Sequence, residues 1–221
     1  MERQYRNLGY FSLLLVAFVG LGFYKPYFSL IPDFGPDLTP LVQVHAMVLI
    51  CLVVLLVVQP FLIRYGKRAL HRTLGKLTYV VMPLLVFSCV GVVMKEYHER
   101  LHQNLPPIIA LKSGYSDVAQ LCLLVVFYAL AIINRRNIPV HMRYMIAVVL
   151  ILAPAGLARV FGYWFDIPRF PSGLATDLLL DAVLIGLIIF DRRNKLNYRP
   201  YLLVLALFVV SHIGFIAVYP R

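Results

Sequence analysis

Ionisable side chains inside long apolar stretches are the residues of this sequence that could do chemistry. They are His45, Arg159, Asp177, Asp181 and His212. Such side chains are costly in a bilayer and mark either a functional site or a paired structural one. Helix rise places His45, Asp177 and His212 at a similar depth, roughly 10 Å below the surface assigned below as the outer one. The sequence therefore predicts one polar layer in the outward half of the molecule.

Two readings of this layer stay open. Asp177 and Asp181 are four residues apart and share a helix face, so their charges would repel unless a proton or a cation lies between them. In the structural reading, Arg159 pairs with an aspartate, and His45 and His212 hydrogen-bond across helices. In the functional reading, the layer is a pocket open to the outside that holds a metal, a proton relay or a small substrate.

Histidine spacing offers candidate zinc ligands. His98 and His102 are four residues apart and present two nitrogens on one helix face, with a third ligand still to be found. Solvated surface histidines are the favoured interpretation of this pair. A zinc-dependent intramembrane hydrolase would use His45, His212 and a carboxylate, but no HExxH motif lies within a predicted span, so this hypothesis ranks lowest.

A second group of histidines is predicted at the cytoplasmic face. His71 with Arg72, and His141 with Arg143, each begin an apolar stretch after a basic segment. Anchoring in the interface, with contacts to lipid phosphates, is the favoured interpretation. The alternative pairs His71 with His141, and His45 with His212, as ligands of two b-type haems in an electron-transfer protein.

Composition defines the class of protein. Of 221 residues, 61% are hydrophobic and only 14% are charged, which is typical of an integral membrane protein. The net charge of +11 lies in short segments between apolar stretches, so anionic lipid headgroups are the expected partner and nucleic acid is excluded. The sequence indicates neither an oligomeric state nor a particular ligand.

The apolar stretches that position these residues predict an all-α bundle of seven transmembrane helices. We expect a single polytopic domain over residues 1–221, with spans at about 8–24, 41–63, 77–94, 117–133, 142–165, 171–190 and 201–219. Lys and Arg are concentrated in alternate loops, including 64–76, 135–143 and 192–199. By the positive-inside rule the N-terminus is cytoplasmic and the C-terminus lies outside.

One set of motifs resembles a family of uncharacterised bacterial multi-pass membrane proteins. The motifs are His45, then Gln59, then a His-Arg-x-x-Gly turn at 71–75, then a His-x-Arg-x-Met helix start at 141–145, with Arg159 downstream. The resemblance covers about half of the chain. It implies a multi-pass protein of the bacterial cytoplasmic membrane and no established reaction. The last two spans lie outside it.

These observations favour a protein that binds or passes a small solute, an ion or a proton through the outward polar layer. The haem protein and the zinc hydrolase remain as alternatives, and whether the protein is an enzyme is open. The sequence contains no phosphate loop, dinucleotide fingerprint or nucleophile elbow in a fitting context.

Overall fold

The computed structural model describes residues 2–33, 35 and 38–219. Seven of its helices are long and apolar enough to cross a membrane. They are α1 (Leu8–Tyr24), α2 (Pro40–Arg64), α4 (Thr78–His102), α6 (Tyr115–Ile133), α7 (Ile138–Phe165), α8 (Arg169–Arg193) and α9 (Arg199–Val218). The described residues contain no strand, so the predicted all-α, seven-helix architecture of a multi-pass membrane protein is confirmed.

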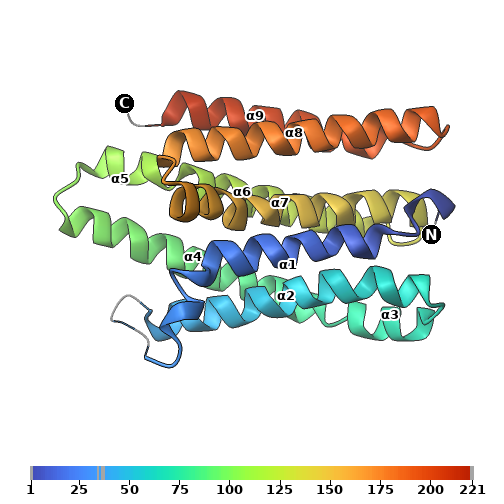
Figure 1. The fold of residues 1–221 in the computed structure, drawn as a ribbon, viewed down its shortest axis with the longest axis horizontal. Helices are drawn as coiled ribbons and strands as arrows, with labels where there is room; N and C mark the ends of the chain where they lie inside the picture. The colour runs from blue at the N-terminus through green and yellow to red at the C-terminus, as the bar shows by residue number, and fades with distance from the viewer. Residues whose placement is uncertain (1, 34, 36–37, 220–221) are drawn as a thin grey trace.

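Helix α7 is the centre of the bundle. It packs against α1, α6, α8 and α9, whereas α2 packs on α1 and α4. Figure 1 shows the resulting order, with α8 and α9 along one edge, α2 and α4 along the other, and α1, α6 and α7 between them. Because α7 has neighbours on most of its circumference, it buries a larger share of its residues than any other spanning helix among the described residues.

Small residues bring the backbones of α1 and α7 together. A Cβ on Gly22 would overlap the Gly156 backbone, and a Cβ on Gly156 would overlap the Phe18 carbonyl. Helix α1 is therefore the partner of α7 in a close backbone contact at Gly156. In a membrane such close approach replaces the hydrophobic driving force that water would supply.

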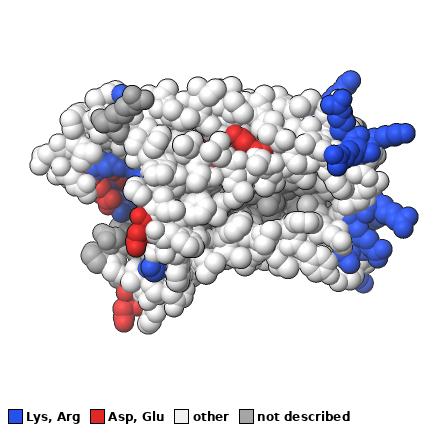
Figure 2. Space-filling model, turned by 45° about the horizontal axis from the view of Figure 1, so that its top comes forward, with Lys and Arg blue, Asp and Glu red and all other residues white. Residues whose placement is uncertain are grey.

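The flanks of the bundle are apolar and the ends are charged. Large side chains such as Phe11, Phe87 and Ile133 are more than half exposed, as expected for residues that face lipid. Figure 2 shows a flank that is uncharged except for one small acidic patch, with Lys and Arg gathered at one end and mixed charges at the other end. The basic end also carries the first described residues (Figure 1), in agreement with the predicted asymmetry of the loops.

Three helical segments lie outside the predicted spans. The basic loop, with its predicted His-Arg-x-x-Gly turn, is instead a short helix, α3 (Arg68–Gly75), in which Leu70 and Leu74 share one face. Helix α4 continues past the predicted span, which ends near residue 94, to His102, because no helix breaker lies between that residue and Pro106. The loop before α6 contains α5 (Pro107–Ser113), which begins at a proline in the first helical position.

Candidate functional site

One histidine bridges two carboxylates between α8 and α9. Nδ1 of His212 lies 3.1 Å from Oδ2 of Asp181, and its Nε2 lies 3.4 Å from Oδ1 of Asp177. All three side chains are more than four-fifths buried, with 16–18% of their surface exposed. The predicted layer is therefore real for these three residues, and the imidazole is its central member.

Local helix geometry explains this arrangement. Asp177 and Asp181 are one helical turn apart on α8, so both carboxylates project toward α9. A five-residue connection turns the chain back, with Lys195 in the left-handed region (φ 54°), and makes α8 and α9 antiparallel neighbours. Residue His212 then lies at the depth of both aspartates, because α9 rises by the same 1.5 Å per residue as α8.

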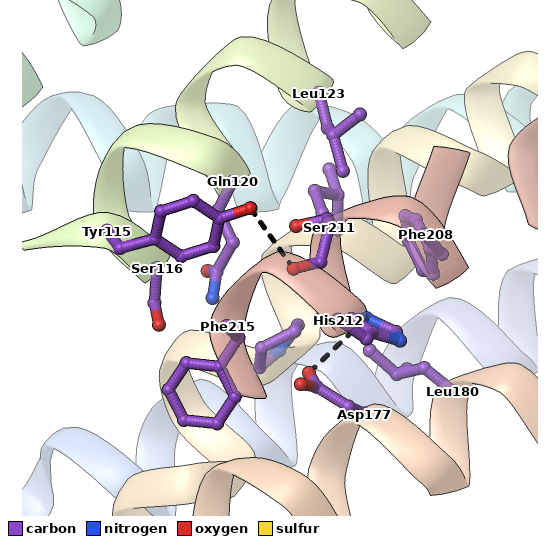
Figure 3. A pocket seen from close by; sticks show the side chains of 12 residues that line it. Tyr115, Ser116, Gln120, Leu123, Asp177, Leu180, Phe208, Ser211, His212 and Phe215 are labelled. Atoms are coloured by element: carbon purple, nitrogen blue, oxygen red, sulfur yellow. Dashed lines mark hydrogen bonds and ion pairs between the residues drawn. The ribbon is translucent and has the colours of Figure 1, made fainter. Parts of the chain in front are cut away.

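A narrow recess opens beside this cluster. Side chains from α6, α7, α8 and α9 line it, and Figure 3 shows Tyr115, Ser116 and Gln120 of α6 on the side opposite Asp177 and His212. There is room for about one water molecule, so an organic solute does not fit in this conformation.

The α6 side of the recess holds polar groups that the sequence analysis did not consider. The Tyr115 hydroxyl donates to the Ser211 carbonyl at 3.3 Å, and it lies so close to Gly214 that a Cβ there would overlap it. From the sequence, only ionisable residues within the spans were candidates for the polar layer. Polar, uncharged residues at the outer ends of α6 and α9 were the signal that could have identified this wall.

The cluster can relocate a proton without changing its charge. An imidazolium between two carboxylates carries a net charge of −1, and so does a neutral imidazole between one carboxylate and one carboxylic acid. In both forms each nitrogen of His212 faces a carboxyl group, so a proton can lie on the histidine or on an aspartate without a change in the net charge. One further proton makes the cluster neutral, which is the state that a low-dielectric environment favours.

The remaining oxygen of Asp181 has no partner. Its Oδ1 is buried and accepts no hydrogen bond from any described residue. A buried carboxylate oxygen without a donor is unfavourable in the charged form. This oxygen is therefore a buried acceptor that can take up a proton.

The other two members of the predicted layer lie elsewhere. Nδ1 of His45 is 3.1 Å from the Ser88 hydroxyl, so this contact joins α2 to α4 on the opposite side of the bundle. Arg159 donates to the Ala155 carbonyl of its own helix, and its guanidinium lies 4.5 Å from the centre of the Phe23 ring. Among the described residues Arg159 forms no ion pair, so the expected bridge between Arg159 and an aspartate of α8 is absent there.

The histidine pairs required by the haem alternative are not formed in the outer half. His45 lies on α2 and His212 on α9, at opposite edges of the bundle (Figure 1). Both nitrogens of His212 already face carboxylates. At the other end, His141 contacts the Ala131 carbonyl at 2.8 Å, and His71 faces the Gln59 amide.

Zinc ligands do not converge either. Within the described part of the chain, no group of three or more His, Cys, Asp or Glu side chains is arranged to hold a metal ion. The two aspartates contact different nitrogens of His212, which directs them to opposite edges of the ring. His98 and His102 are both exposed near the end of α4, in agreement with the solvated interpretation.

Arg143 departs most from its predicted environment. We expected it at the lipid headgroups, as we did the exposed Arg72, but it is fully buried and its Nε lies 2.6 Å from Asp191, which is also fully buried. Asp191 was not among the candidate residues predicted from the sequence. Its signal was a single acid immediately before Arg192 and Arg193, in an otherwise basic segment.

Comparison of the chain with known proteins identified no related protein. No family model matches the chain, and no curated protein or solved structure is similar to it. The resemblance to bacterial multi-pass proteins therefore stays a prediction.

Proposed function

We propose that this protein binds protons in the outward half of the membrane and passes them along the α8–α9 interface. The observation that carries this proposal is the imidazole of His212, which bridges Asp177 and Asp181 through its two nitrogens. We place the protein in the cytoplasmic membrane of a bacterium, a location that rests on the family resemblance described above.

The dimensions of the recess favour a proton over the other ligands first considered. A solute needs a pocket that encloses it, whereas a proton needs only acceptors connected by hydrogen bonds. Tyr115 and Ser116 stand at the beginning of α6, near the outer end of the bundle, and lead to Asp177 and His212. The free Oδ1 of Asp181 provides an acceptor one turn deeper.

Proton flux into liposomes tests the proposal. Purified protein is reconstituted, a pH gradient is imposed, and a trapped pH-sensitive dye reports the flux. We expect Asp181→Asn to reduce the flux by about 100-fold, the lower part of the range for losing one proton-transfer group. Asp166→Asn is the matched control, because Asp166 is exposed and its left-handed backbone (φ 53°) also suits asparagine.

Two results would contradict the proposal. One is a wild-type flux no higher than that of protein-free liposomes. The other is an Asp181→Asn protein that folds and conducts protons at the wild-type rate.

A further inference from the structure

A second polar cluster occupies the opposite end of the same helices. Arg143 of α7 and Asp191 of α8 form an ion pair at 2.6 Å, and neither side chain is exposed to solvent. Asp191 and Asp181 are ten residues apart on α8, which corresponds to roughly 15 Å along the helix axis. The pair therefore lies near the basic end of the bundle, well below the proposed proton site.

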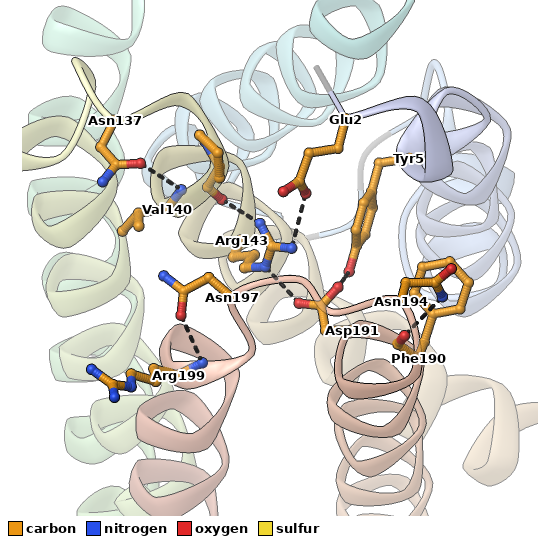
Figure 4. Close-up of polar contacts among 11 residues, drawn as sticks. Glu2, Tyr5, Asn137, Val140, Arg143, Phe190, Asp191, Asn194, Asn197 and Arg199 are labelled. Carbon is orange, nitrogen blue, oxygen red and sulfur yellow. Dashed lines mark hydrogen bonds and ion pairs between the residues drawn. The ribbon is translucent and has the colours of Figure 1, made fainter.

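The segment before α1 closes over this ion pair. The Tyr5 hydroxyl donates to Oδ1 of Asp191 at 2.6 Å, and a carboxylate oxygen of Glu2 lies 2.9 Å from Nη2 of Arg143. Figure 4 shows Glu2 and Tyr5 reaching the pair from the same side. Both members of the pair thus take a partner from a segment that is remote from α7 and α8 in the chain.

The contacts of Arg143 depend strongly on this segment. Its Nη1 donates to the Pro139 carbonyl at 2.9 Å, and its guanidinium lies 5.3 Å from the Tyr5 ring and 5.8 Å from the Tyr201 ring. Buried charges are tolerated only where such contacts are complete. Losing Glu2 and Tyr5 would leave one flank of the guanidinium without protein partners, and water would take their place.

Apolar side chains separate this cluster from the proton site. Leu184, Val204 and Phe208 lie between the two clusters on α8 and α9, and all three are fully buried. Tyr201 and His212 are eleven residues apart, about three helical turns, and so lie on the same face of α9. The α8–α9 interface is thus polar at both ends and dry in the middle.

The closing segment itself is short and weakly anchored. Residues Arg3–Tyr5 form a single turn of 3-10 helix, and Arg3 and Gln4 are exposed. Only Tyr5 is deeply buried in this turn, at 6% exposure. A segment that contributes one buried side chain, one side-chain hydrogen bond and one ion pair can open locally at much lower cost than a spanning helix.

We propose that Glu2 and Tyr5 form a lid that closes the cytoplasmic end of the α8–α9 interface over the Arg143–Asp191 pair. With the lid closed, both the ion pair and the apolar layer of Leu184, Val204 and Phe208 separate the proton site from the cytoplasm, and protons pass slowly. With the lid open, water reaches the ion pair, so only the apolar layer remains between the cytoplasm and the proton site, and protons pass faster. The role of the lid in flux rests on the proposed proton function, but its effect on access to Arg143 does not.

Chemical labelling of arginine measures this access directly. Protein in liposomes is treated with phenylglyoxal, and modified arginines are located by mass spectrometry, with the exposed Arg193 as internal reference. We expect Arg143 to be protected in the wild type and at least tenfold more reactive in Glu2→Gln and Tyr5→Phe. Arg3→Gln is the matched control, because it changes the charge of the same segment at an exposed position.

Proton flux is measured on the same samples and separates the two proposals. Faster flux together with a reactive Arg143, in both lid variants and not in the control, supports the lid. An Arg143 that stays protected in both variants overturns it, whether or not the protein conducts protons. A reactive Arg143 with unchanged flux, in protein whose flux depends on Asp181, overturns the gating role. Absent flux in the wild type instead contradicts the proposed function, whatever the labelling shows.

Discussion

Whether a buried charged residue exchanges a proton or keeps a fixed charge depends on its partners. His212 has two carboxylate neighbours and can exchange a proton with either, so its charge state belongs to the cluster. Arg143 is fixed in a different way, because the guanidinium remains charged and each of its nitrogens has an assigned contact. The first arrangement suits proton exchange, and the second suits a structural pair that excludes water.

The Arg143–Asp191 pair gives a prediction about stability. Asp191→Asn leaves the guanidinium without its closest anion, and we expect a loss of about 3 kcal/mol in the free energy of unfolding, as for other buried pairs broken on one side. Denaturant titration in detergent, followed by circular dichroism, measures this loss. The double change Arg143→Met with Asp191→Leu should lose less than Asp191→Asn alone. A double variant as unstable as the sum of its two single changes would contradict this account.

At the scale of helices, the contact between α1 and α7 positions the central helix. The two backbones meet at Gly22 and Gly156, where neither chain has space for a Cβ. This contact holds α7 against α1 on one side, while its other faces carry Arg143 and pack against α8 and α9. Displacing α7 from α1 would therefore disturb the ion pair at the basic end of the bundle.

The Gly156 position provides the prediction at this scale. Gly156→Ala places a methyl group against the Phe18 backbone, and we expect a loss of about 1–3 kcal/mol, the usual range for overpacking. Gly162→Ala, on the same helix, is the matched control, because the nearest atom to its Cβ would be 3.9 Å away. Thermal unfolding of both variants in detergent measures the difference. Equal stability of the two alanine variants would show that α1 and α7 can move apart to accommodate the methyl group without a loss in the free energy of unfolding.

At the scale of the whole molecule, hydropathy and charge predicted the spans and the depth of each residue, but they did not predict which side chains are partners. The spans followed from apolar length, and six of seven predicted ranges fall within a few residues of the helices described. Depth along each helix also followed from the sequence, which is why Asp177, Asp181 and His212 were grouped correctly. Two residues at the same depth can lie on helices that do not contact each other. His45 was therefore grouped with His212, although α2 and α9 lie at opposite edges of the bundle. Arg143 was misplaced because a basic residue at a helix start usually faces lipid phosphates.

The orientation of the whole bundle decides which compartment each cluster faces. We expect the basic end to be cytoplasmic, and single cysteines on a background without Cys51, Cys89 and Cys122 test this. In intact cells a membrane-impermeant maleimide should label Gln103→Cys, near the end of α4, and leave Arg193→Cys unlabelled until the cells are opened. The reverse pattern would place the His212 recess toward the cytoplasm and the Glu2–Tyr5 lid outside. Because both proposals assign a side to each cluster, that result would reverse the direction in which the lid controls proton entry.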